Sequence, residues 1–295
     1  MPNPFFQLEQ LANGVFGGIS SDAGMTVSNA GIGDFGSFTL VWDATASPLA
    51  AQVLKSEAQM LTGKPVRYVV NSHHHLDHIR GNQVFSEASI VSSRTTRALG
   101  DERLSRFISD SDGFSATLRR LEALDQGTLH LVQQKILDAQ ILELRSELEI
   151  IESFVPTLPT LTFSSALEFH GETRSAQILE FGGHTGSDSV LWLPEDGVLF
   201  AGDLVLVAHL GFIGHGNPTR WLKTLDSLAA LPIQRLVPGH GSVTDATAIP
   251  KMRAYLLEMQ RLATLESDEI PDAWHGWGLL EGFSANLEFL RSKLG

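Results

Sequence analysis

The feature that most constrains this chain is a cluster of metal-binding side chains at residues 73–78, which read His-His-His-Leu-Asp-His. Histidine nitrogens and aspartate oxygens are donors that zinc, iron and manganese accept. A loop carrying His73 and His75 can direct both imidazoles at one ion, while Asp77 and His78 can turn toward a second. An expression tag, the main non-functional alternative beside a surface histidine cluster, would lie at a terminus and lack the aspartate. The pattern therefore predicts a metal site.

The residues before this cluster indicate where it lies in the fold. The run at 66–70, Val-Arg-Tyr-Val-Val, is β-branched and aromatic, as is typical of a buried strand. Residues 76–82 are expected to begin a helix or turn that closes at Gly81. The histidines thus follow the carboxyl end of a strand, where ligand sites concentrate in α/β folds.

Three later segments each place one further donor just after a strand-like run. His184 lies in a Gly-rich turn, Asp203 ends the apolar run that begins at residue 199, and His240 ends another that begins at residue 236. Taken singly, each is a weak signal, because an aspartate at a strand end more often belongs to a turn. In this order after the first cluster, they extend the predicted metal site.

With these residues the chain resembles the metallo-β-lactamase superfamily from residue 28 to residue 241. The resemblance implies an α/β fold, a four-layer αββα sandwich, and two divalent metal ions, zinc first with iron or manganese as alternatives. It implies that one ion is bound by His73, His75 and His184. It implies that the other is bound by Asp77, His78 and His240, with Asp203 bridging the two.

The branches of this superfamily differ at the same positions. The β-lactamase branches have Cys or Ser where this chain has Asp203, and the chain contains no Cys. The flavo-diiron branch carries Glu where this chain has His75. The pattern resembles the glyoxalase II-like, lactonase-like and phosphodiesterase-like hydrolases, and residues 71–82 look most like glyoxalase II.

Charge and hydropathy exclude two classes of partner. The net charge is −13, with 21 Lys and Arg against 34 Asp and Glu, which argues against a protein that binds nucleic-acid phosphates. No run approaches the roughly 18 apolar residues of a membrane span. Residues 1–6 have no basic region, so they do not read as a signal peptide. The expected partner is a small-molecule substrate, and the expected location is the cytoplasm.

The pattern along the chain predicts one domain over residues 1–295, with a helical insertion at about 101–155. Apolar residues recur at helical spacing in that insertion, which predicts helices. These helices could serve stability alone, by packing on the domain, or they could form a lid over the site or the interface of a homodimer. The other expected helices are 47–61, 218–228 and 246–265. The expected strands lie within 14–44 (including 25–27), 160–169, 176–181, 189–193, 198–202 and 235–237.

The predicted function is hydrolysis of a carboxylic ester, thioester or lactone. Two ions can share a hydroxide, because metal binding brings the pKa of water down toward about 7. Asp77 and Asp203 are the predicted catalytic carboxylates, since they offset the charge of the ions and Asp77 can move a proton. A mononuclear iron oxidoreductase of the persulfide dioxygenase type and a phosphodiesterase of the same fold remain alternatives.

Residues around the motif carry weaker expectations. His74 lies between His73 and His75, so its side chain should point away from the ions that they bind. Asn71, Ser72 and Asp188 are expected to orient imidazoles. His209 and His215 follow the bridging aspartate in sequence, and each is expected to be either a substrate contact or a surface residue. The apolar run 204–213 and the acidic, aromatic tail 266–277 predict a pocket for a neutral acyl group rather than the glutathione thioester.

Overall fold

The computed structural model describes residues 3–20, 28–123, 137, 141, 145, 148–151 and 153–294. Within these residues, twelve strands form two sheets. The seven-stranded sheet has the order β1 (Phe6–Ala12), β2 (Val15–Ser20), β3 (Ala30–Asp34), β4 (Thr39–Trp42), β5 (Val66–Val70), β6 (Ser89–Ser93) and β7 (Leu161–Phe163). The five-stranded sheet has the order β12 (Arg235–Val237), β11 (Val198–Phe200), β10 (Ser189–Leu193), β9 (Ser175–Glu180) and β8 (Ala166–His170).

The direction of pairing changes inside both sheets. Strands β1 to β4 are antiparallel, whereas β4 to β7 are parallel. Strands β8 to β11 are antiparallel, and β12 lies parallel to β11. Parallel neighbours end at the same edge, so the loops that follow β4 and β5 lie together, as do the loops that follow β11 and β12.

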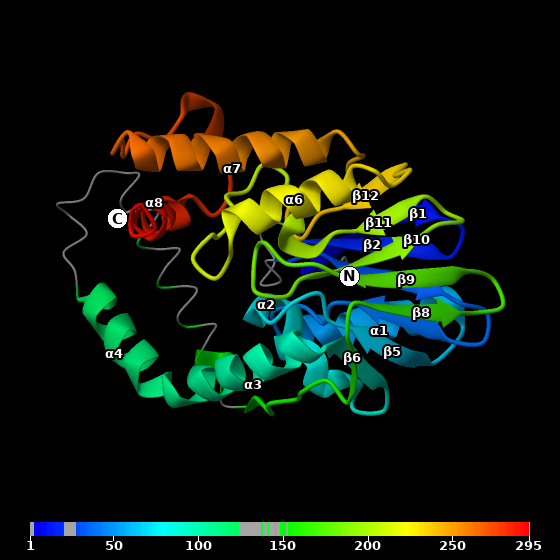
Figure 1. Cartoon of the computed structure of the whole chain (residues 1–295). Helices are drawn as coiled ribbons and strands as arrows, with labels where there is room; N and C mark the ends of the chain where they lie inside the picture. Colours follow the sequence, from blue (N-terminus) through cyan, green and yellow to red (C-terminus); the bar gives the residue numbers. More distant parts are fainter. Residues whose placement is uncertain are drawn as a thin grey trace.

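Helices cover both outer faces of the sheet pair (Figure 1). The helices are α1 (Pro48–Thr62), α2 (Leu76–Ile79), α3 (Arg94–Ser109), α4 (Ser111–Glu122), α6 (Pro218–Leu228), α7 (Ala248–Thr264) and α8 (Phe283–Arg291). Short 3-10 turns are η1 (Arg80–Phe85), η3 (Gly202–Leu204), η4 (Asp272–Trp274) and η5 (Leu280–Gly282). Helix α1 lies against the seven-stranded sheet, and α6 and α7 lie against the other sheet.

Alternate residues of a strand point to opposite faces, and this divides the core into three layers. In β4, Leu40 and Trp42 face the second sheet, whereas Val41 packs against α1. In β10, Leu191 faces the first sheet, whereas Trp192 packs with the α6 and α7 residues. Apolar side chains therefore fill the space between the sheets and beneath both helical layers, which confirms the predicted αββα sandwich.

Helix α1 shows why the predicted boundaries hold. Ser47 accepts a hydrogen bond from the backbone N–H of Ala50, and Pro48 occupies the first turn, where no N–H is required. Gly63 ends the helix with a left-handed φ of 67°. The predicted closure at Gly81 is wrong, because the chain continues as η1 to Phe85.

Gly81 serves close packing instead of helix termination. A Cβ atom at this position would lie 1.8 Å from the carbonyl oxygen of Ala44 and 2.5 Å from the Cβ of Ala51. Only glycine lets the turn after the histidine cluster lie directly against the loop after β4. This contact places the cluster next to Asp43.

The helical insertion is confirmed at its described residues. Helix α3 begins at Arg94, earlier than the predicted start at 101, because Ser93 accepts a hydrogen bond from the backbone N–H of Thr96. Helical backbone also occurs at Leu137 and Ile141, two of the apolar residues at helical spacing in the insertion. Another of them, residue 144, and the predicted strand 25–27 lie outside the described residues. Strands β1 and β6 and helix α8 lacked a clear sequence signal, β6 because it contains three serines in five residues.

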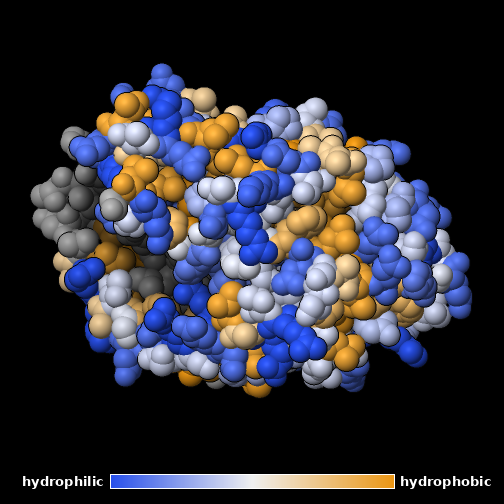
Figure 2. All heavy atoms as spheres, in the orientation of Figure 1, coloured by the Kyte–Doolittle hydropathy of each residue, from blue (hydrophilic) through white to orange (hydrophobic). Residues whose placement is uncertain are grey.

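The predicted homodimer stays a prediction, because much of the helical insertion lies outside the described residues. Large exposed apolar residues lie on different elements, and Figure 2 shows them interspersed with polar residues on the face in view. Scattered apolar residues of this kind are ordinary protein surface. No helix in the described part of the chain is both long and apolar enough to cross a membrane.

Candidate metal centre

The histidine cluster forms a buried turn at the end of β5. The side chain of Asn71 donates hydrogen bonds to Oδ1 of Asn82 (3.0 Å) and to the carbonyl oxygen of His78 (3.4 Å). These bonds close the turn on itself and direct the imidazoles of His73 and His78, which are both buried, toward the interior. Asn71 therefore shapes the turn and bonds no imidazole, contrary to the prediction for it.

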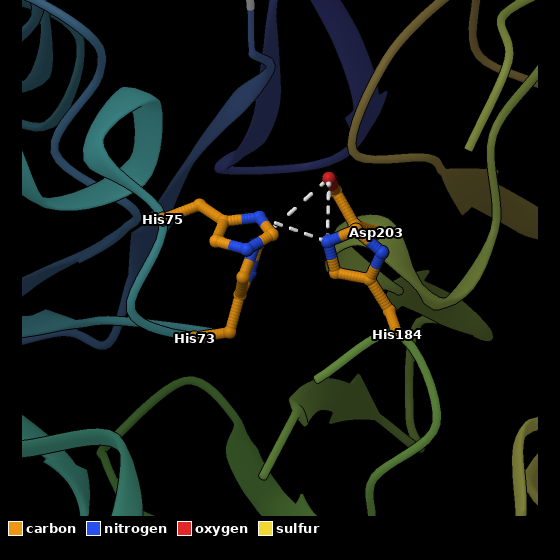
Figure 3. Close-up of side chains that lie close together, drawn as sticks. All are labelled: His73, His75, His184 and Asp203. Atoms are coloured by element: carbon orange, nitrogen blue, oxygen red, sulfur yellow. Dashed lines mark hydrogen bonds and ion pairs between the residues drawn. The ribbon is translucent and has the colours of Figure 1, made fainter. Parts of the chain in front are cut away.

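One group of four donors gathers beside this turn (Figure 3). It contains His73 and His75 from the turn, His184 from the loop between β9 and β10, and Asp203 from η3. The Nδ1 atom of His75 lies 3.0 Å from Nε2 of His184, and that Nε2 lies 3.3 Å from Oδ2 of Asp203. Donors from distant parts of the chain thus point toward one common centre.

A second group of three donors lies next to the first, formed by Asp77, His78 and His240. The Nε2 atoms of His78 and His240 each lie 3.4 Å from Oδ2 of Asp77. Asp203 also reaches this group, with Oδ1 lying 3.2 Å from His78 Nε2 and Oδ2 lying 3.3 Å from His240 Nε2. The structure therefore brings together all seven predicted residues, as two groups that Asp203 joins.

Two loops hold His184 and Asp203 in place. Asp188 accepts hydrogen bonds from the backbone N–H (2.9 Å) and hydroxyl (2.8 Å) of Thr185, which fixes the turn that carries His184. Asp188 was predicted to orient an imidazole, but its carboxylate bonds to Thr185 instead. A Cβ at Gly239 would lie 1.9 Å from Oδ1 of Asp203, so the close approach of β12 to η3 requires glycine there.

Two side chains orient imidazoles of the cluster. The hydroxyl of Ser72 lies 2.9 Å from Nδ1 of His73, which confirms the predicted role of Ser72. Asp43, which the sequence interpretation missed, is fully buried, with Oδ2 2.8 Å from Nδ1 of His78. Its other oxygen accepts a hydrogen bond from the backbone N–H of Ser72 at 2.7 Å. Asp43 directly follows β4, so a strand-end carboxylate was the available signal.

Burial and charge affect the imidazoles of the two groups differently. Burial holds the pKa of His73 and of His75 well below the usual value. Burial also lowers the pKa of His78 and of His240, but nearby carboxylates outweigh it and leave both pKa values raised. The carboxylates thus create a negative potential that favours positive charge at the centre.

The donors fit divalent metal ions. Nε2 of His73 is buried and makes no hydrogen bond, and Nε2 of His78 and Oδ1 of Asp203 face each other at 3.2 Å without forming one. Buried polar atoms without partners are costly in a folded protein, and bound ions would satisfy them. Imidazole and carboxylate ligands suit zinc, iron and manganese.

The comparison with known proteins agrees with this centre. A family model described as "Metallo-beta-lactamase superfamily" matches residues 24–240, a span that contains every donor of both groups. The chain belongs to the metallo-β-lactamase superfamily. Members of this superfamily are mostly hydrolases.

Individual relatives are distant. The chain is 24% identical to the hydroxyacylglutathione hydrolase of Rhodospirillum rubrum over 237 residues, which cover 77% of this chain and 72% of the relative. It is 25% identical to the hydroxyacylglutathione hydrolase of Rhodobacter capsulatus over 214 residues, which cover 69% of this chain and 61% of that relative. The metallo-beta-lactamase from Pontibacter korlensis has the same fold, with a TM-score of 0.63, 17% identity, and coverage of 85% of this chain and 99% of that one.

The remaining histidines have varied environments. His74 is buried and lies outside both donor groups, as predicted, with its ring 5.0 Å from that of His75. His215 reaches the site directly, because its Nδ1 lies 2.9 Å from Nε2 of His75. The ring of His209 lies 5.9 Å from that of His240. Of the others, His170 and His275 are exposed, and residue 130 lies outside the described residues.

The segments predicted to line an apolar pocket belong mainly to the core. Leu204, Val205, Leu206, Leu210 and Ile213 are buried among the α6 and α7 residues. In the tail, Trp274 is buried and stacks on Trp277. Phe212 differs, since it is 37% exposed with its ring 6.2 Å from that of His75. The prediction was wrong for the buried residues because an apolar run after a strand can serve the core as well as a pocket.

Proposed function

We propose that this protein is a binuclear metal-dependent hydrolase of a small-molecule carboxylic ester, thioester or lactone. The observation that carries the proposal is the pair of donor groups joined by Asp203, whose two oxygens both lie near imidazoles of the centre. Two ions held there would lower the pKa of a water molecule toward about 7 and polarise the substrate carbonyl.

The protein's own residues divide the remaining work. The side chain of Asp203 is only 6% exposed and makes contacts in both groups, so it would keep the two sets of donors in register. Asp77 has a side chain that is 22% exposed, so it can meet solvent and substrate. We assign the movement of a proton from the attacking water to a carboxylate oxygen of Asp77. Asp43 and Ser72 would hold the imidazoles in their orientations.

The substrate class rests on the relatives and on the donor set. The relatives named hydroxyacylglutathione hydrolase act, by that name, on a thioester of glutathione. A thioester is therefore the first substrate to test. The expected preference for a neutral acyl group over the glutathione thioester loses most of its basis. Most apolar residues after Asp203 lie in the core, whereas Phe212 lies beside the site.

Metal content and a substrate panel test this function together. The panel contains chromogenic esters, thioesters including the glutathione thioester, lactones and phosphodiesters, each assayed after loading with zinc, iron or manganese. We expect two ions per chain and hydrolysis of the ester or thioester class. About one iron per chain with no zinc would instead favour the persulfide dioxygenase reaction, and activity on phosphodiesters alone would favour a phosphodiesterase.

A further inference from the structure

The two ring nitrogens of His75 face different neighbours. Its Nδ1 lies inside the first donor group, 3.0 Å from Nε2 of His184. Its Nε2 points the other way and lies 2.9 Å from Nδ1 of His215, which is 140 residues away in sequence. Neutral imidazole carries one proton, so the partner of Nε2 decides whether Nδ1 keeps a lone pair for an ion.

The loop that carries His215 packs directly on the turn that carries His184. A Cβ at Gly216 would lie 2.2 Å from the carbonyl oxygen of Gly183 and 2.7 Å from that of His184. The backbone N–H of Asn217 donates to the carbonyl oxygen of Gly183 at 2.8 Å. These contacts tie the position of His215 to that of His184, a donor of the first group.

A second set of buried contacts holds the same loop from the C-terminal helices. Asn286 of α8 is 0% exposed, and its Oδ1 accepts a hydrogen bond from the backbone N–H of Ile213 at 2.7 Å. Its amide nitrogen donates to the carbonyl oxygen of Gly211 at 2.8 Å, and the hydroxyl of Tyr255 donates to the same oxygen at 2.7 Å. The ring of Phe212 packs 4.9 Å from that of His215. The position of His215 is thus set on several sides.

We propose that His215 is a positioning residue that fixes the metal-binding form of His75. Its Nδ1 accepts the hydrogen bond from Nε2–H of His75, which leaves the Nδ1 lone pair of His75 directed into the first donor group. Outer hydrogen bonds of this kind fix ring orientation and raise the basicity of a ligand. This inference rests on the proposed metal binding and adds a residue to it that lies outside both donor groups.

The same imidazoles could alternatively bind a further ion themselves, since one nitrogen each of His74, His75 and His215 lies within 4.8 Å of the others. Two observations favour positioning. An ion on Nε2 of His75, with Nδ1 already used, would require a doubly deprotonated ring. The positive charge of Arg103 also bears on this cluster: burial lowers the pKa of His74 to about 3, and Arg103 contributes to that shift and to the lowered pKa of His215.

Metal affinity tests the proposal without relying on turnover. His215→Leu removes the acceptor at similar size, whereas His215→Asn keeps an acceptor oxygen near the position of Nδ1. His170→Ala is the control, because the His170 side chain is 73% exposed on β8. Zinc dissociation constants are measured on the full chain by chelator competition, and nitrogen-15 NMR of the loaded protein reports the protonated nitrogen of His75.

We expect His215→Leu to weaken binding of one zinc ion by about 10–100-fold, with His215→Asn recovering most of the loss and His170→Ala unchanged. The wild type should show a proton on Nε2 of His75. Unchanged affinity in His215→Leu, with two ions bound by the wild type, overturns the positioning role alone. A third ion that His215→Leu loses would show that the cluster binds metal itself, which also overturns it. A wild type that binds no metal refutes the proposed function and the inference together.

Discussion

Replacing Asp43 by asparagine would separate the shape of this side chain from its charge. Asp43 accepts two hydrogen bonds inside the protein, from Ser72 N–H at 2.7 Å and from Nδ1 of His78 at 2.8 Å. An ionised carboxylate only accepts, so the proton lies on Nδ1 of His78 and leaves Nε2 free for an ion. Asparagine has nearly the same shape but offers one acceptor oxygen and one NH₂ group, which only donates.

Neither orientation of that amide keeps both contacts as the carboxylate makes them. With its oxygen toward Ser72, the amide NH₂ faces Nδ1 of His78 and forces the proton onto Nε2, where it blocks metal binding. With its oxygen toward His78, the NH₂ faces the N–H of Ser72, and buried donors remain unpaired at a cost of about 1–3 kcal/mol. Loss of such an outer partner weakens metal binding about 10–100-fold, which corresponds to about 1.4–2.7 kcal/mol.

Chelator competition on Asp43→Asn should therefore show a weakened ion at the group of Asp77, His78 and His240. Asp34→Asn is the matched control. Asp34 lies away from the centre, is partly exposed, and forms an ion pair of 2.7 Å with Lys64. The control should bind both ions as the wild type does. If Asp43→Asn also bound both ions with wild-type affinity, the assigned tautomer of His78 would be refuted.

Three further predictions concern the same centre. Asp203→Ala should abolish turnover and reduce the measured metal content, whereas His74→Ala should keep both, and equal behaviour of the two would contradict their assigned positions. Gly239→Ala should lower the melting temperature by several degrees and weaken metal binding, because its Cβ would lie 1.9 Å from Oδ1 of Asp203; calorimetry and metal analysis report this. The raised pKa values of His78 and His240 mean that protons compete with an ion there, so affinity at this group should rise with pH through neutrality, and a pH-independent affinity would contradict it.

The sequence alone determined which His and Asp side chains form the candidate metal centre, and most of the secondary structure. His73, His75, Asp77 and His78 are close in sequence and follow a strand, so their proximity depends only on local chain geometry. The boundaries of α1 follow similarly from a serine cap and a glycine end. Local patterns also predicted α6 at residues 218–228, as the structure has it. Each of these features is encoded within a few residues.

The tertiary structure decided which side chains act on those donors. Asp43 meets His78 from 35 residues away, and His215 meets His75 from 140 residues away. It also placed Leu204 and Val205 in the core and left Phe212 beside the site, although all three belong to one apolar run. Composition is the same for a core segment and a pocket wall, so only the path of the backbone and the packing of neighbouring layers distinguish them. The orienting contacts depend on that packing, because they join segments with no local relation in sequence.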